Sequence, residues 1–144
     1  MDWLITKQGE AAGFPVEMNV ARAGEDLLVF LQGGRKPHIG CTVLAVPRQS
    51  LTGSGAMSTT SSVLNVTGHK DEVLCRRTAE MFCSMLGTVT VCAGGFHIDN
   101  ISEDQIREVS AAVEKMGHEI ALALSASGCK KESGSVVSDD VKCV

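Results

Sequence analysis

The chain has 144 residues, of which 44% are hydrophobic and 21% are charged, and this composition predicts one globular domain with a single core. A net charge of −4, an aromatic content of 3% and the lack of tyrosine argue against a nucleic-acid-binding surface. The lack of a dense basic run argues against a membrane-binding one. Because no apolar stretch could span a bilayer and the first residues lack the pattern of a signal peptide, we expect a cytoplasmic protein.

The first predicted strands form a hairpin. Residues 1–13 give little signal, and we expect them to fray or to add an edge segment. Alternating apolar residues predict a strand at 16–21, and an apolar run predicts another at 27–32. The residues between them, 23–26, have the composition of a tight turn, so the two strands should pair antiparallel.

Two further strands are expected on either side of a loop. Residues 39–46 are rich in β-branched side chains and predict a third strand, which Pro47 should stop. Residues 48–57 contain glycines and hydroxyls and predict a loop. The hydroxyl-rich segment 58–67 also contains β-branched residues, so we expect it to form a fourth strand.

Two amphipathic helices follow. Asp71 can cap the first, whose apolar residues recur at helical spacing until Gly87 ends it. Ser102 and Gln105 have the spacing of a capping box at the start of the second, which Gly128 should end. Between the helices, a short strand is expected at 88–93, before the pair Gly94-Gly95.

The order of these elements predicts an α+β fold. A mostly antiparallel β-sheet should carry the two amphipathic helices packed on one face. Residues 1–128 should form this single domain, and the charged, serine-rich residues 129–144 should form a disordered tail. The other face of the sheet is then solvated or covered by a partner, and we expect a homodimer or a complex with a partner protein.

The six cysteines do not have the spacing of a metal or redox motif, because none forms a C-x-x-C pair. Four of them lie within apolar, periodic segments, where cysteine behaves as a small buried hydrophobic residue: Cys41, Cys75, Cys83 and Cys92. Cys129 and Cys143 lie in the polar C-terminal stretch and are expected to be exposed thiols. Reduced structural cysteines are therefore the main interpretation.

Polar, glycine-flanked patches at 33–38, 46–50, 58–72 and 94–100 concentrate the chemically useful side chains. We expect the remainder of the chain to act as a scaffold that brings these four patches together at one site.

The patches allow a metal site as one interpretation. Three histidines, His38, His69 and His97, are expected at strand ends, with Asp71 and Asp99 nearby. Imidazole and carboxylate suit zinc or iron. No two of these histidines share a short ligand spacing such as H-x-H or H-E-x-x-H, however. His118, in the last helix, is expected to be a surface residue.

A second interpretation is phosphate binding. The glycine- and hydroxyl-rich loop at 53–60 could hold a phosphate through its backbone N–H groups, with Arg35, Arg48 and Lys70 as countercharges. The loop lacks the lysine and spacing of a P-loop and the G-x-G-x-x-G fingerprint. A small acyl hydrolase is the weakest alternative, because the chain has no G-x-S-x-G elbow.

Together the patches resemble a known small family. The strings are G-G-R-K-P-H-I-G at 33–40, P-R-Q-S-L-T-G-S-G at 47–55, S-T-T-S-S-V-L-N-V-T-G-H-K-D-E at 58–72 and G-G-F-H-I-D-N-I at 94–101. They are similar to those of the prenylated-flavin chaperone family, which includes the small D subunit of bacterial gallate decarboxylase. The resemblance covers about residues 33–101. It also suggests, more loosely, the sheet-plus-helices fold of proteasome assembly chaperones.

The resemblance implies a carrier rather than an enzyme. The protein would bind prenylated FMN, made by a separate flavin prenyltransferase, and insert it into the large subunit of a decarboxylase that acts on gallate-type hydroxyarylic acids. Arg48, Ser58, Thr60 and Lys70 would contact the cofactor phosphate. No residue is expected to be catalytic, and the cofactor contacts would lie among the polar motif positions: His38, Arg48, Ser50, Ser58, Thr60, Ser61, Asn65, His69, Lys70, Asp71, His97, Asp99 and Asn100. The alternative is a small metal-dependent enzyme that uses His38, His69, His97 and a nearby aspartate.

Overall fold

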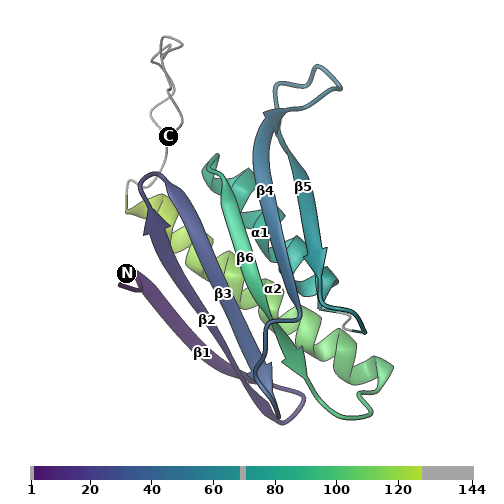
Figure 1. Cartoon of the computed structure of the whole chain (residues 1–144). Helices are drawn as coiled ribbons and strands as arrows, with labels where there is room; N and C mark the ends of the chain where they lie inside the picture. Colours follow the sequence, from purple (N-terminus) through teal and green to yellow (C-terminus); the bar gives the residue numbers. More distant parts are fainter. Residues whose placement is uncertain (1, 69–70, 128–144) are drawn as a thin grey trace, which may run out of the picture.

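The computed structural model of the chain describes residues 2–68 and 71–127. In this part of the chain, six strands and two helices follow one another (Figure 1). The elements, in chain order, are β1 (Ile5–Ala11), β2 (Phe14–Ala23), β3 (Asp26–Gly34), β4 (Cys41–Gln49), β5 (Met57–Asn65), α1 (Glu72–Leu86), β6 (Thr90–His97) and α2 (Glu103–Ala126).

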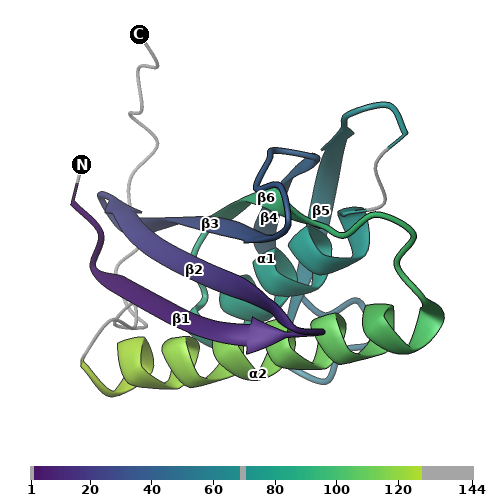
Figure 2. The same cartoon turned by 90° about the horizontal axis from the view of Figure 1, so that it is seen from below.

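The six strands form a single sheet in the order β1-β2-β3-β6-β4-β5. All neighbouring strands pair antiparallel except β3 and β6, which are parallel. The last strand in the sequence therefore lies in the middle of the sheet, between the hairpin of β2 and β3 and the hairpin of β4 and β5. Both helices lie on one face of the sheet (Figure 2), so the predicted α+β class is confirmed.

The core lies between this covered face and the helices. Val29 of β3 is opposite Val20 of β2 and Cys92 of β6, and all three side chains are fully buried. Helix α1 packs on β4, β5 and β6, whereas α2 packs on β1 and β2. Alternate residues of the strands face the helices, as the period of two requires.

The four cysteines expected in the core are buried there, and their thiols are free: Cys41, Cys75, Cys83 and Cys92. Burial raises the pKa of the Cys41 thiol to about 12 and that of the Cys83 thiol to about 11. A hydrogen bond with Cys75, together with burial, raises the pKa of Cys92. Cys41, Cys83 and Cys92 are therefore protonated structural groups at neutral pH.

Residues 5–11 form a regular edge strand that pairs with β2 along its whole length, so of the two expectations for residues 1–13 the edge segment is confirmed. Two other strand predictions need correction. Pro47 does not end β4, because the strand continues to Gln49 on β5. Its pairing with β6 already ends at Ala45, so the strand has a free side where a missing N–H is tolerated. Strand β6 also runs through Gly94 and Gly95 to His97.

The predicted helix ends are mostly confirmed. Ser102 and Gln105 form the capping box of α2, and Gly87 ends α1 with a left-handed backbone at φ 67°. Asp71 lies at the N-cap of α1, but its side chain makes no capping hydrogen bond, which corrects the prediction. Gly128 and the predicted tail, 129–144, lie outside the described residues. Neither helix is long and apolar enough to cross a bilayer, and the described residues contain no other.

The face of the sheet opposite the helices carries no element of the described chain. Half-buried Phe30 and Val91 lie on this face, next to Leu44, which is 40% exposed. Towards β1 the face becomes polar, and Glu17 accepts hydrogen bonds from Asn19 and two glutamines. These bonds lower the pKa of Glu17, with the bond from Asn19 contributing most. The molecule thus has one covered face and one open, mixed face.

Candidate functional site

A cavity of about 540 Å³ lies where β6 ends and both helices begin. Its walls are mainly apolar, and a few polar groups from the sequence patches lie at its margin. The lining residues are Gly68, Asp71, Val73, Leu74, Phe96, His97, Ile98, Asn100, Ile101, Ile106, Val109 and Ser110. An apolar cavity of this size with a small number of polar groups is typical of a small-molecule site.

Asp71, which lines the large cavity, connects three segments of the chain. Its Oδ2 lies 3.0 Å from Nε2 of His38, in the loop before β4. Its Oδ1 accepts a hydrogen bond of 2.9 Å from the backbone N–H of Phe96, in β6. The Asp71 side chain is only 7% exposed. Because its carboxylate reaches across to the sheet in this way, it is not turned towards the first turn of its own helix.

The hydrogen bonds of His38 engage both of its ring nitrogens. The carbonyl oxygen of Lys36, 3.1 Å from Nδ1, can only accept, so the Nδ1–H donates to it. On the other side of the ring, Nε2 faces the Asp71 carboxylate. The orientation of the ring is therefore fixed at both ends.

Because two glycines have no side chain, they leave room for the His38–Asp71 pair. A Cβ atom on Gly40 would lie 2.0 Å from Oδ2 of Asp71. A Cβ atom on Gly95 would lie 2.9 Å from both Cγ of Asp71 and Cε1 of His38. Any side chain at either position would therefore displace the His38–Asp71 pair. This steric conflict explains why both positions are occupied by glycine.

His97 lies against the His38–Asp71 pair. Its ring makes an edge-to-face contact with the His38 ring, with 5.8 Å between the two centroids. Its Nε2 lies 3.0 Å from Oδ1 of Asp99, and this bond lowers the pKa of the Asp99 carboxyl, with smaller contributions from Lys36 and Arg35. His97 lines the cavity, so the His38–Asp71 pair supports a histidine that faces a ligand-sized space.

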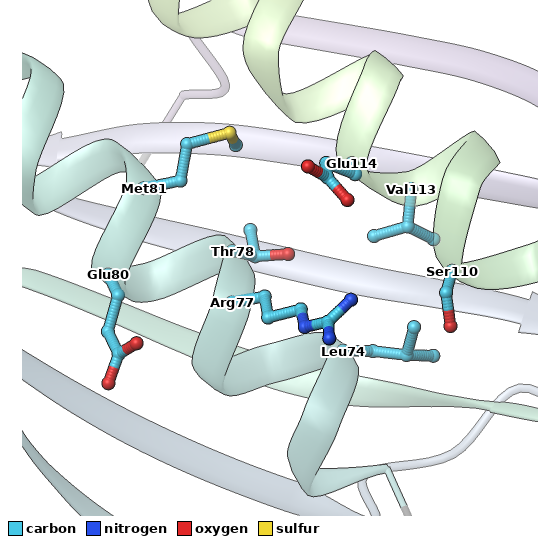
Figure 3. A pocket seen from close by; sticks show the side chains of 8 residues that line it. All are labelled: Leu74, Arg77, Thr78, Glu80, Met81, Ser110, Val113 and Glu114. Carbon is cyan, nitrogen blue, oxygen red and sulfur yellow. The ribbon is translucent and has the colours of Figure 1, made fainter.

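A second, smaller cavity of about 300 Å³ lies further along the two helices (Figure 3). It is lined by Leu74, Arg77, Thr78, Glu80, Met81, Ser110, Val113 and Glu114. Leu74 and Ser110 line both cavities, so the two are adjacent. They form one trough along the seam between α1 and α2, which we call the helix-seam trough.

The structure brings part of the predicted site together. His38, Asp71, His97 and Asp99 form one connected cluster, and Asn100 lines the large cavity beside it. The expectation that patches from distant parts of the sequence converge is confirmed for these residues. His69 and Lys70 lie outside the described residues.

The patch at 46–50 does not join this cluster, and the prediction of a single site for all four patches is wrong in this respect. Cys41 pairs with Gly94 near the cluster, and Arg48 lies seven residues further along β4. At about 3.3 Å per residue this separation is roughly 23 Å. Arg48 instead donates a hydrogen bond of 2.9 Å to Thr60 on β5, and it pairs in the strand register with Ser58.

The remaining predicted residues are already engaged elsewhere. Ser50 lies beyond β4, where its hydroxyl contacts Thr52 at 2.8 Å. Ser61 donates a hydrogen bond of 2.5 Å to Glu80, and Asn65 donates one of 3.1 Å to Glu72. The last two bonds tie β5 to α1, and none of the residues Ser50, Ser61 and Asn65 lines either cavity.

Sequence reasoning missed the apolar walls of the large cavity. Phe96, Ile98 and Ile106 are ordinary apolar residues in a strand, a loop and a helix, and nothing in their local pattern distinguishes them from core residues. Ile106 falls in the apolar stripe of α2, and only the structure shows that it is 46% exposed. The described residues contain no group of three or more His, Cys, Asp or Glu side chains that could hold a metal ion. A site built on the three predicted histidines would thus depend on His69, outside that part of the chain.

Comparisons with known proteins agree with this geometry. The fold is similar to a chain in the crystal structure of a chaperone complex for yeast 20S proteasome assembly, with a TM-score of 0.52 over 83% of this chain and 94% of that one. The sequence identity is 11%, so this likeness shows the fold alone.

Protein LpdD of Lactiplantibacillus plantarum (strain ATCC BAA-793 / NCIMB 8826 / WCFS1) is 25% identical over 138 residues, which cover 95% of this chain and 97% of that protein. Residues 10–125 match the sequence model of the prenylated flavin chaperone LpdD-like domain, and this match includes both cavities and the histidine cluster. The chain therefore belongs to the family of prenylated flavin chaperones with an LpdD-like domain.

Proposed function

We propose that the protein carries prenylated FMN and delivers it to the large subunit of a decarboxylase that acts on gallate-type hydroxyarylic acids. The observation that carries this proposal is the large cavity of about 540 Å³, with apolar walls and the His38–Asp71–His97 cluster at its margin. Membership in the prenylated flavin chaperone family supports the choice of ligand.

The residues present suit this cofactor. A prenylated flavin ring is flat and largely apolar, and Phe96, Ile98 and Ile106 supply apolar walls. The ring also has polar atoms along one edge, and His97 and Asn100 offer side-chain hydrogen-bonding groups at the margin of the cavity. When bound in the decarboxylase, the cofactor supplies the chemistry of decarboxylation. The proposed role of this chain is to hold the ring away from water until transfer.

A carrier needs a rigid site but no reactive acid–base pair. His38 is already held on both ring nitrogens, by the Lys36 carbonyl and by the Asp71 carboxylate. We therefore propose that the protein is not itself a catalyst and acts in the cytoplasm beside the enzyme it serves. A flavin prenyltransferase is the proposed source of the cofactor.

The proposal is tested by binding and by transfer. The purified protein should bind prenylated FMN under anaerobic conditions, and the loaded protein should activate the cofactor-free decarboxylase subunit faster than free cofactor does. The protein alone should release no carbon dioxide from gallate. Failure to bind prenylated FMN, or a decarboxylase that is activated equally well without the protein, would contradict the proposal.

A matched pair of variants locates the binding site. Ile106 lines the large cavity and is 46% exposed, whereas Leu122, on the same helix, is 51% exposed and lines neither cavity. Ile106→Glu should weaken the binding of prenylated FMN about tenfold, because an apolar wall is replaced by a charge. Leu122→Glu should leave the affinity unchanged. Equal effects of the two substitutions would place the cofactor elsewhere.

We also propose that the protein forms a homo-oligomer through the open face of the sheet. Phe30, Val91 and Leu44 lie together on this face, on neighbouring strands. Apolar side chains that are gathered on one surface are typical of protein interfaces.

A further inference from the structure

We propose that Arg77 binds the phosphate of the cofactor, and that the cofactor lies along the helix-seam trough with its ring in the large cavity and its phosphate over the small one. This inference rests on the proposed function, because it assigns an orientation to the same ligand. It names a residue that neither the sequence patches nor the histidine cluster includes.

The position of Arg77 is the first argument. It lines the small cavity together with Leu74 and Ser110, and these two residues also line the large cavity. Figure 3 shows the Arg77 guanidinium extending from α1 towards α2, beside Leu74. The charge therefore belongs to the small cavity, whose lining includes two residues that also line the large one. Among the described residues, Arg77 is also the one arginine or lysine that lines either cavity.

The second argument is that this charge is available. In the described part of the chain, the Arg77 guanidinium makes no hydrogen bond or ion pair. Its neighbour Arg76 differs: it donates to Glu72 at 2.5 Å and to Ser61 at 3.1 Å, on the side facing β5. A planar guanidinium that has no protein partner and borders a cavity can bind a phosphate through two parallel hydrogen bonds.

The third argument concerns the charges around the trough. The lining of the large cavity contains no arginine or lysine among the described residues, so this half of the trough offers no comparable countercharge for a phosphate. Glu80 and Glu114 line the small cavity, but Glu80 is turned to β5, where it accepts a hydrogen bond of 2.5 Å from Ser61. Neither glutamate forms an ion pair with Arg77 in the described part of the chain.

The length of the trough is also suitable. From Ile106, in the large cavity, to Glu114, in the small one, α2 advances eight residues. At 1.5 Å per residue this distance is about 12 Å along the helix axis. The trough thus has room for a ring system and for the start of a side chain that leads to the phosphate.

The test compares two ligands and three proteins. Prenylated FMN and the same cofactor after removal of its phosphate by a phosphatase are titrated anaerobically into the wild-type protein, Arg77→Ala and Arg76→Ala. Arg77→Ala should weaken the binding of prenylated FMN about tenfold to hundredfold, the effect of losing a charge-assisted contact. It should leave the affinity for the dephosphorylated cofactor unchanged. Arg76→Ala removes the same charge one residue away and should change neither affinity.

Each other outcome has a definite meaning. Equal affinity of the wild type and Arg77→Ala for prenylated FMN would overturn the role of Arg77 and leave the proposed function standing. An equal loss for both ligands would show that Arg77 maintains the cavity and does not bind the phosphate. A wild-type protein that binds neither ligand would overturn the proposed function itself. Thermal unfolding of the variants checks that all are folded, which is expected because Arg77 is exposed.

Discussion

Asp71 lies at the N-cap of α1, yet its carboxylate contacts His38 and the backbone N–H of Phe96 instead of its own helix. In place of the usual N-cap bond, the Asp71 side chain makes contacts that join α1 to β6 and to the loop that precedes β4. Burial makes these contacts important, because a buried polar group without a partner costs about 1–3 kcal/mol. At the scale of single residues, the site therefore depends on this side chain.

Two substitutions at Asp71 should have different effects on stability. Asp71→Ala removes the acceptor of the Phe96 N–H and the contact with Nε2 of His38, so we expect the free energy of unfolding to fall by about 1–3 kcal/mol. Asp71→Asn can still accept from Phe96 and can donate to a neutral His38, so its loss should be less than half as large. Urea unfolding at pH 7 measures both values. An Asp71→Ala variant as stable as the wild type would contradict this account of the carboxylate.

The buried thiols should be inert in the folded protein. Burial holds the pKa of Cys83 at about 11 and that of Cys41 at about 12, against an ordinary value of 9.0. A raised pKa means that the folded state keeps the thiol protonated where the unfolded state loses its proton. The buried neutral thiols therefore contribute fully to the free energy of unfolding below pH 9, and this contribution is lost as the pH rises from 9 to 12. Iodoacetamide at pH 8, followed by peptide mapping, should label Cys41 and Cys83 only after unfolding. Rapid labelling of Cys83 in the native protein would contradict its burial.

At the scale of elements, the residue before β4, Gly40, and Gly95 of β6 both approach Asp71 closely, and nothing larger fits at either position. Neither glycine has a positive φ, so the requirement is steric and not conformational. Gly40→Ala and Gly95→Ala should each lower the free energy of unfolding by about 1–3 kcal/mol, because they push the His38–Asp71 pair apart.

Gly9→Ala is the matched control for these two substitutions. Gly9 also lies in or beside the sheet without a positive φ, but a Cβ there would meet the flexible end of Met116 at 3.1 Å. Its effect on stability should be within about 0.5 kcal/mol. If all three variants lose the same stability in urea unfolding, the glycines are needed for the strands in general and not for the space around the His38–Asp71 pair.

The elements that the sequence predicted well are those with local signals. The capping box at Ser102 and the stop at Gly87 depend on neighbouring residues, and both are confirmed. The central position of β6 has no such signal, because its parallel partner β3 is more than 50 residues earlier in the chain. The role of Asp71 was mistaken for the same reason: its position in the sequence is that of a cap, and its partners are distant.

The candidate site was predictable to a similar extent. Glycines beside His38 and His97 indicated turns and close approaches, and the two rings do meet. Arg48 lies in another polar patch of the sequence, but the direction of β4 carries it away from the cluster. The apolar cavity wall around Ile106 could not be recognised, because a helix face that lines a cavity has the same periodicity as one that lines a core.

At the scale of the whole molecule, the open face of the sheet should mediate self-association. Phe30 is half-buried at the centre of this face, next to Ala93 on β6 and Asn19 on β2. Phe30→Glu would place a charge in the proposed interface, so the variant should sediment as a monomer where the wild type does not. The far-UV circular dichroism of the two proteins should match. A wild-type protein that remains monomeric across a wide concentration range would contradict the proposed homo-oligomer.

The insertion of β6 between two earlier hairpins also has a consequence for how the protein is made. During synthesis, β2–β3 and β4–β5 can each pair as soon as they leave the ribosome, but each then has an unpaired edge that waits for β6. The parallel pairing of β3 with β6 is a late, non-local step, and such steps are slow. Phe96 and His97 arrive with β6, so the large cavity does not exist until the sheet is closed. A nascent chain can therefore bind a ligand there only after nearly all of the domain has been translated.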